Sequence, residues 1–183
     1  GHVNPLLALA DAITESNSDD KVWALGTAEG LESRLVPERG YTLLTVERLP
    51  FPRRLNAAAL KFPGRYLAAV RKVEGYLKQH RIDVVVGFGG YASAPAYTAA
   101  NRLGIPVVIH EANALPGMAN RMAARKAAEV AVAFSNTKIH NATFVGMPLR
   151  KEIETLAKGI TKADRFAARA HFGLDESTTT LLV

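Results

Sequence analysis

The second residue of the chain, His2, is the first candidate for catalysis. Imidazole has an unperturbed pKa of about 6.5, so near neutral pH it can take a proton from an attacking hydroxyl group. His2 follows Gly1 and precedes a segment, residues 5–15, whose apolar spacing is typical of a helix. Loops between a strand and the next helix lie at the carboxyl edge of a doubly wound sheet, where ligands bind. We therefore predict that His2 is a general base in such a loop and that this loop follows a strand upstream. The alternative is that His2 only caps the helix or packs against it.

A second candidate is the glycine-rich loop from Gly87 to Ser93, which follows an apolar run and precedes a helical segment. Glycines let backbone amides approach a phosphate, and the partial positive charge at a helix start favours anions. Gly89, Gly90, Tyr91 and Ser93 are therefore candidates for phosphate binding. The competing interpretation is a tight turn that needs glycine at positive φ.

Polar residues also follow the apolar run 106–109, where His110, Glu111 and Asn113 stand close together. Buried polar groups are costly unless they are paired or used. The amide of Asn113 can donate to and accept from sugar hydroxyl or acetamido groups, and Glu111 can orient a hydroxyl or a histidine. Alternatively, Asn113 caps the next helix and Glu111 holds a loop.

Arg150 follows another apolar run, residues 143–145. Its guanidinium can form charge-assisted, bidentate hydrogen bonds to a diphosphate, although a solvated surface arginine is an equally good interpretation. The chain contains no cysteine, and we find no Asp-x-Asp motif. We therefore predict no metal site and no cofactor.

The positive charge of the chain is concentrated in one segment. Residues 48–81 hold nine Lys or Arg and a single Glu, and the net charge of the whole chain is +6. A basic segment attracts nucleic acid or phospholipid head groups. Aromatic residues that could stack on bases are few here, so we expect an anionic membrane surface and no nucleic acid.

Apolar residues lie among these charges, around a helix break predicted at Pro63-Gly64. They can insert into a bilayer surface while basic residues meet anionic lipids; a solvated basic face is the alternative. No apolar run approaches the roughly 18 to 20 residues that span a bilayer. The predicted membrane patch consists of Arg53, Arg54, Leu60, Lys61, Phe62 and Arg65.

Short apolar runs must position these residues. The runs are continuous, which is typical of parallel strands covered by helices on both faces. The predicted strands are residues 22–25, 84–88, 106–109, 130–134, 143–145 and 181–183. The predicted helices are residues 5–15, 65–80, 95–102 and 117–128, and Tyr66, Val70, Val73 and Leu77 should face the core. The sequence therefore predicts an α/β fold, a Rossmann-like parallel sheet with helices on both faces.

The character of the chain changes after Arg150. Residues 151–172 are polar and helical, and residues 178–183 indicate a further strand. We predict one Rossmann-like domain over residues 1–150, and over residues 151–183 a linker with the start of a second domain. The eight residues between Phe134 and Thr143 are too few for a full helical crossover.

Several motifs, in order, resemble the MurG family, which transfers N-acetylglucosamine to lipid I to give lipid II in peptidoglycan synthesis. Gly1-His2 with Pro5 resembles the end of its first glycine loop, GGTGGH. Residues 87–95 resemble its GxGGYxSxP loop, and residues 104–111 with Asn113 are similar to its GIPVxxHExN signature. Residues 146–150 resemble its GNPVR motif, with Met147 in place of Asn and Leu149 in place of Val.

The resemblance implies the N-terminal, acceptor-binding half of an inverting GT-B glycosyltransferase at the cytoplasmic face of the bacterial membrane. It implies that His2 is the base for the muramic acid 4-hydroxyl, with Glu111 also catalytic. Gly1, Asn113 and Arg150 would contact UDP-N-acetylglucosamine. Gly89, Gly90, Tyr91 and Ser93 would bind the diphosphate of the undecaprenyl-linked muramyl pentapeptide, lipid I. The fragment alone should be inactive.

Two other functions remain open at this stage. A non-catalytic subunit could recruit the acceptor or the membrane for a separate catalytic partner. A nucleotide-sugar epimerase of similar fold would need additional carboxylates in the site and no lipid-facing basic patch.

Overall fold

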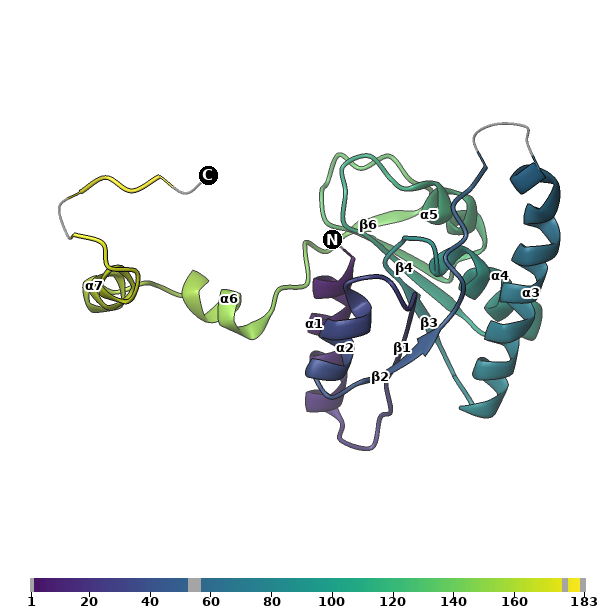
Figure 1. Ribbon diagram of the computed structural model, residues 1–183, viewed down its shortest axis with the longest axis horizontal. Coiled ribbons are helices and arrows are strands. Elements are labelled where there is room, and N and C mark those ends of the chain that lie inside the picture. The colour runs from purple at the N-terminus through teal and green to yellow at the C-terminus, as the bar shows by residue number, and fades with distance from the viewer. Residues whose placement is uncertain (1, 53–56, 176–177, 182–183) are drawn as a thin grey trace. The chain divides into compact units, whose positions relative to one another are not determined.

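The computed structural model describes residues 2–52, 57–175 and 178–181, and the chain divides into two units, Gly1–Pro148 and Leu149–Val183 (Figure 1). The first unit alternates helices and strands in a regular order. Its elements are α1 (Val3–Ser16), β1 (Trp23–Gly26), α2 (Glu32–Glu38), β2 (Thr42–Thr45), α3 (Ala57–Gln79), β3 (Val85–Gly87), α4 (Ser93–Leu103), β4 (Val107–Glu111), α5 (Met118–Ala123), the 3-10 helix η1 (Ala124–Lys126), β5 (Glu129–Val132) and β6 (Ala142–Phe144).

All strand pairs of the first unit are parallel. One sheet pairs β1 with β2, and a second has the order β3-β4-β5-β6. The predicted α/β class and the strands expected near residues 22–25, 84–88, 106–109, 130–134 and 143–145 are confirmed. β2 was missed because its segment, Thr-Leu-Leu-Thr, has only two apolar residues.

The core of the first unit lies mainly between α3, α4 and the larger sheet. Val70 and Val73 of α3 are 0% and 1% exposed, and they pack with Ile109 of β4 and Val130 of β5. The predicted inward face of α3 is therefore confirmed. A smaller cluster joins Leu7 of α1, Ala24 of β1 and Val36 of α2.

The predicted helix break at Pro63-Gly64 is wrong, since α3 continues through Pro63. Proline removes one backbone N–H and crowds the preceding turn, which usually interrupts a helix. Here the packing of the later turns of α3 against α4 outweighs that local cost. The helix expected over residues 117–128 is shorter than predicted, because η1 tightens the last turn before β5 begins.

The second unit contains α6 (Lys151–Ala157) and α7 (Lys162–His171). One continuous helix over residues 151–172 was expected, but Gly159 adopts φ +141° and Thr161 starts a new helix. Thr161 and Asp164 form a capping box, in which the Asp164 amide donates to the Thr161 hydroxyl at 3.1 Å. Residues 178–181 form no strand, contrary to the prediction, and the remaining residues of that predicted strand, 182 and 183, lie outside the described residues.

Candidate functional site

His2 stands directly before α1 and lies against the glycine loop. A Cβ built on Gly89 would be 3.3 Å from Cε1 of His2, and one built on Gly90 would be 3.6 Å from its Cδ2. Both glycines have φ close to +90°, a backbone conformation that residues with a side chain rarely adopt. The loop therefore lets an imidazole from the start of the chain approach the backbone at the end of β3.

The glycine loop leads into α4, as predicted. The hydroxyl of Ser93 donates to the carbonyl of Gly89 at 2.6 Å, which ties the loop to the first turn of the helix. Tyr91 is 45% exposed, and the guanidinium carbon of Arg48 lies 4.9 Å from the centre of its ring. A positive side chain thus stands beside the loop that was expected to meet an anion.

Glu111 ends β4 with a buried carboxylate that holds the following loop. Its Oε1 accepts from the backbone and side-chain amides of Asn113, at 2.9 and 2.8 Å. Its Oε2 accepts from the Gly117 amide and from Nδ2 of Asn120, both at 2.9 Å. The alternative in which Glu111 holds a loop therefore describes its contacts.

Burial alone would raise the pKa of Glu111, because it penalises the charged form. The hydrogen bonds from Gly117, Asn113 and Asn120 act in the opposite direction and prevail, so the pKa of this carboxyl is lowered from its usual value. Glu111 is consequently an ionised acceptor, which suits an anchor for N–H groups.

Asn113 is exposed at the rim of the site, with its amide nitrogen bound to Glu111. Its backbone carbonyl accepts from the Thr137 hydroxyl at 3.2 Å. The helix-capping alternative for Asn113 is wrong, because Gly117 is the N-cap of α5 and no side chain caps that helix.

Asn120, which sequence reasoning missed, connects the two loops. It is fully buried, donates to Glu111, and accepts from the Tyr97 hydroxyl at 2.7 Å. A Cβ on Gly89 would lie 3.4 Å from its Nδ2. Burial raises the pKa of Tyr97, so its hydroxyl remains a donor. The available signal was that Asn120 shares a helical face with Ala123 and Ala124, three and four residues further on.

The glycine loop, Asn120 and Glu111 thus form one contiguous group at the carboxyl ends of β3 and β4, with His2 against it. His110, also at the end of β4, points Nε2 at the Gly146 carbonyl, 2.9 Å away, and its buried Nδ1 has no hydrogen-bond partner in the described structure. Among the described residues, no group of His, Asp and Glu is arranged to hold a metal ion.

Gly1, Arg53 and Arg54 are outside the described residues. Arg150 belongs to the second unit, where it is the N-cap residue of α6. The role of Arg150 at the site therefore stays a prediction from the sequence.

The predicted membrane patch is partly described, on the first turns of α3. Leu60 is 85% exposed and Lys61 is also exposed. Phe62 is partly buried, with its ring 5.8 Å from Tyr66 and 5.4 Å from Phe51. Arg65 forms an ion pair with Glu47. None of the described helices is both long and apolar enough to cross a membrane.

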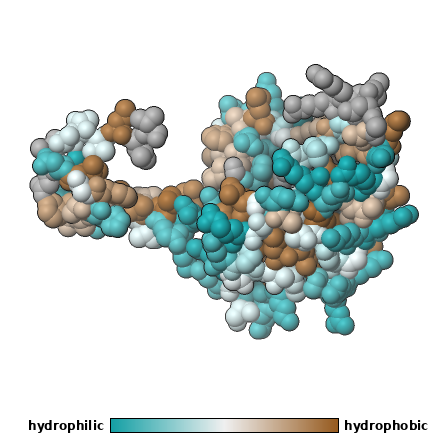
Figure 2. Space-filling view, viewed as in Figure 1, coloured by the Kyte–Doolittle hydropathy of each residue, from teal (hydrophilic) through white to brown (hydrophobic). Residues whose placement is uncertain are grey.

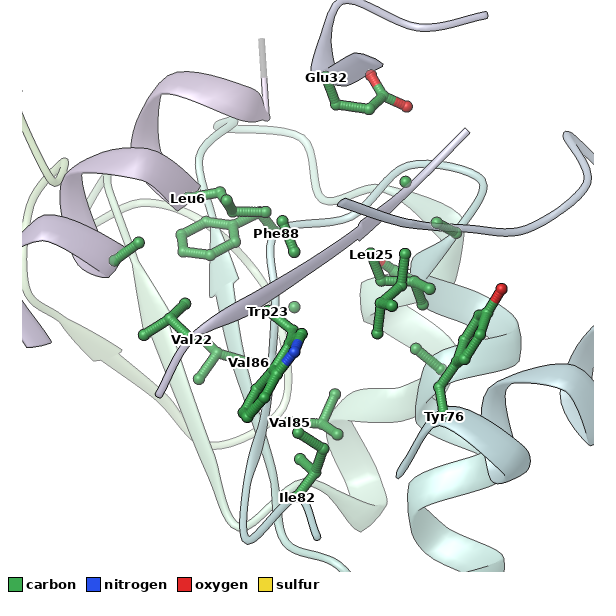
Figure 3. Close-up of a pocket in the computed structure, with 18 of the residues that line it drawn as sticks. Leu6, Val22, Trp23, Leu25, Glu32, Tyr76, Ile82, Val85, Val86 and Phe88 are labelled. Atoms are coloured by element: carbon green, nitrogen blue, oxygen red, sulfur yellow. The ribbon is translucent and has the colours of Figure 1, made fainter. Parts of the chain in front are cut away.

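A cavity of about 1060 Å³ opens beside this group and continues between β1 and β3 (Figure 3). His2, Gly89 and Gly90 are among the residues that line it, and most of the other lining residues are apolar. Glu32, also on its wall, accepts from the amide and hydroxyl of Thr27, both at 2.8 Å.

A parallel α/β domain with a glycine loop at the carboxyl ends of its strands is the architecture found in GT-B glycosyltransferases. The chain belongs to the glycosyltransferase family 28 N-terminal domain, whose family model matches residues 1–132. It is 56% identical over its full length to the UDP-N-acetylglucosamine--N-acetylmuramyl-(pentapeptide) pyrophosphoryl-undecaprenol N-acetylglucosamine transferase of Leifsonia xyli, and 46% identical to the protein of the same name from Streptomyces coelicolor. The resemblance to the MurG family inferred from the motifs is confirmed.

A solved structure agrees with these relatives. The crystal structure of Acinetobacter baumannii MurG matches this chain with 34% sequence identity and a TM-score of 0.69. The matched region covers 84% of this chain and 44% of the MurG chain. The chain spans about half the length of the curated relatives it matches.

Proposed function

We propose that this chain is the acceptor-binding half of an inverting GT-B glycosyltransferase that moves N-acetylglucosamine from UDP to the 4-hydroxyl of lipid I. The observation that supports it most is the position of the His2 ring beside the Gly89-Gly90 loop. A base and a phosphate-binding backbone stand side by side there, as the transfer requires. The names of the relatives support the same reaction.

In this proposal His2 takes the proton from the 4-hydroxyl as its oxygen attacks the anomeric carbon. The C–O bond to the diphosphate of UDP breaks in the same step, so the configuration inverts without a covalent intermediate. The negative charge that develops on UDP needs nearby N–H groups or cations. Gly1, Asn113 and Arg150 are proposed to meet the UDP-sugar from this half of the enzyme.

The glycine loop is proposed to bind the lipid I diphosphate. Gly89 and Gly90 leave its backbone open, and the start of the 11-residue α4 adds a favourable dipole. Arg48, which stacks on Tyr91, adds positive charge beside it. Ser93 contributes by fixing the loop to the helix.

Glu111, predicted as catalytic, is proposed to act through Asn113. Both of its oxygens are bound to N–H groups, and its lowered pKa makes it a poor proton acceptor at neutral pH. It holds the Asn113 nitrogen and leaves the carbonyl end of that amide to face a substrate. Asn120 supports this arrangement through its hydrogen bond to the other oxygen of Glu111.

The exposed start of α3 is proposed to hold the enzyme peripherally on the cytoplasmic face of the bacterial membrane. Leu60 and Lys61 present an apolar and a basic side chain together, and Arg53 and Arg54 would extend the patch. Phe62 is proposed to support this surface from its stack on Tyr66. Anionic phospholipid is the expected partner.

The deciding experiment is transfer of labelled N-acetylglucosamine from UDP to a lipid I analogue by the complete protein. Formation of the lipid II analogue is expected, and a protein that binds UDP-N-acetylglucosamine but never labels the lipid would refute the proposal. No observation favours the epimerase, since the carboxylates of Glu32 and Glu111 each accept hydrogen bonds from neighbouring groups of the protein. Turnover by the complete protein without a second subunit would also exclude the purely recruiting function.

A further inference from the structure

The connection between β5 and β6 takes no part in the proposed chemistry. It joins two adjacent parallel strands over residues 133–141, all of them described, without forming a helix, although parallel neighbours are usually joined through one. It begins with a turn in which the Thr137 amide donates to the Phe134 carbonyl at 3.1 Å. Most of its residues are exposed, but Thr137 is only 6% exposed. The connection therefore buries one polar side chain.

The buried hydroxyl of Thr137 is bound to the Asn113 loop, residues 112–117, which follows β4. It donates to the backbone carbonyl of Asn113 at 3.2 Å, and the structure gives it no other hydrogen bond with the described residues. β4 and β5 are neighbours in the sheet, and the Ala133 amide donates to the Glu111 carbonyl at 2.9 Å. The loops after these two strands therefore run close together (Figure 1).

Packing contributes little to the position of the Asn113 loop. Residues 113–115 and 117 are exposed, and Leu115 is 87% exposed. Polar and apolar residues are mixed along the upper edge of the first unit, where these loops lie (Figure 2). The position of the loop therefore depends mainly on hydrogen bonds, from its N–H groups to Glu111 and from Thr137 to its carbonyl.

These hydrogen bonds leave Asn113 with one free polar atom. Its backbone N–H and its Nδ2 are bound to Glu111, and its backbone carbonyl is bound to Thr137. The side-chain oxygen Oδ1 has no hydrogen bond with the described residues, and Asn113 is exposed. A carbonyl oxygen can only accept, so Oδ1 needs a hydroxyl or an N–H of a ligand. A displacement of about 1 Å would weaken such a contact.

We propose that Thr137 is a positioning residue for the UDP-sugar. Its hydroxyl holds the backbone of Asn113, so that Oδ1 keeps the position from which it accepts a hydrogen bond from the sugar. This inference rests on the proposed contact of Asn113 with UDP-N-acetylglucosamine. Thr137 is buried and acts through Asn113, so its loss should weaken binding of the UDP-sugar and leave proton transfer to His2 intact.

The test compares Thr137→Val with Thr137→Ser in the complete protein. Valine keeps the shape of threonine without its hydroxyl, whereas serine keeps the hydroxyl. Thr42→Val, at an exposed position where β2 begins, is the matched control. If the valine variant does not fold, Thr137→Ala takes its place.

Thr137→Val should raise KM for UDP-N-acetylglucosamine by about 2- to 10-fold, the factor of one hydrogen bond, and change kcat and KM for a lipid I analogue by less than about 2-fold. Thr137→Ser and Thr42→Val should keep the original constants. Equal rises in the two KM values, or the same loss with serine as with valine, would overturn the inference.

A double-mutant cycle tests whether Thr137 acts through Asn113. Asn113→Ala removes Oδ1 but keeps the backbone carbonyl that Thr137 binds. In this background Thr137→Val should leave KM for UDP-N-acetylglucosamine unchanged, because the group that it positions is gone. The same fold-change in both backgrounds would show that Thr137 acts by another route, against the proposal.

Amide exchange in the complete protein without substrates tests the hydrogen bond separately from sugar transfer. The amides of Asn113 and Gly117 should exchange faster in Thr137→Val than in Thr137→Ser, because the loop is held less firmly. The amide of Val130, in the core strand β5, should exchange at the same rate in both. Unchanged exchange at Asn113 and Gly117 would refute the inference while the proposed function stands. Absence of transfer by the unaltered protein would refute the proposed function instead, so the two failures are distinguishable.

Discussion

The chemistry proposed for this chain depends on one imidazole. His2 is exposed and precedes α1, and its ring lies beside the glycine loop. This places an imidazole, the side chain most often used as a general base, beside the backbone of the loop.

We predict that His2→Ala in the complete enzyme lowers kcat by about 10²- to 10⁴-fold, the usual contribution of a general base. Steady-state kinetics with a lipid I analogue measure this. His140→Ala, an exposed histidine after β5, is the matched control and should be neutral. A His2→Ala enzyme with the original rate would remove His2 from the mechanism.

A second residue-scale prediction concerns Asn120. Asn120→Ala removes one hydrogen-bond partner each from Glu111 and Tyr97 in a buried site, which costs about 1–3 kcal/mol of stability. If Asn120 also positions the glycine loop, KM for the acceptor should rise more than KM for UDP-N-acetylglucosamine. Equal changes in both KM values would show that it acts on stability alone.

The titration of Glu111 gives a prediction about pH. Its folded pKa is lowered, so its contribution to stability is present above its unfolded pKa, near 4.5, and is lost as the pH falls through the folded value. Glu111→Gln should therefore cost most near neutral pH and much less in acid. Urea unfolding at several pH values measures this, with the exposed Glu129→Gln as control. A cost that is the same at every pH would contradict the ionised anchor.

At the scale of elements, two parallel strands and the helices that follow them assemble the site. β3 and β4 end at the same edge, so the loops after them meet although 20 residues or more separate some of their members. α3 contributes differently, since its buried face packs the core while its first turns present Leu60 and Lys61 outward.

Charge reversal on this element should weaken membrane binding. We predict that Arg53→Glu, Arg54→Glu and Lys61→Glu together reduce binding to anionic vesicles at low salt, because each charge near the surface contributes about 1 kcal/mol. Vesicle sedimentation measures the bound fraction. The same reversal at Arg34, Lys138 and Lys162, outside the patch, should have a smaller effect. Equal losses of vesicle binding for the two triple variants would show that the patch has no specific role beyond the positive charge of the chain.

At the scale of the whole molecule, the chain matches its relatives over about half of their length. A GT-B enzyme binds its acceptor and its UDP-sugar in two different domains. The site described here would therefore be only one half of the whole active site. The second unit, with α6 and α7, contributes Arg150 to the proposal.

We therefore predict that the purified 183-residue chain transfers no labelled N-acetylglucosamine, whereas the complete protein does. Radiolabel in the lipid fraction is the measurement, and a folded fragment, shown by cooperative unfolding, is the necessary control. Turnover by the fragment would contradict the division of labour between two domains.

The sequence by itself determined the fold class, most strands, and the family, because buried parallel strands need unbroken apolar runs and the glycine motifs keep a fixed order. Val70, Val73 and Leu77 were identifiable because helical spacing directs them to one face. β2 escaped, since two leucines between threonines carry little signal, and α3 passed through Pro63 because long-range packing outweighed a local cost. Only the tertiary structure showed that Glu111 is held by four N–H groups, that Asn120 joins two loops, and that a cavity separates β1 from β3. These facts depend on distances between residues far apart in the chain, which no local pattern encodes.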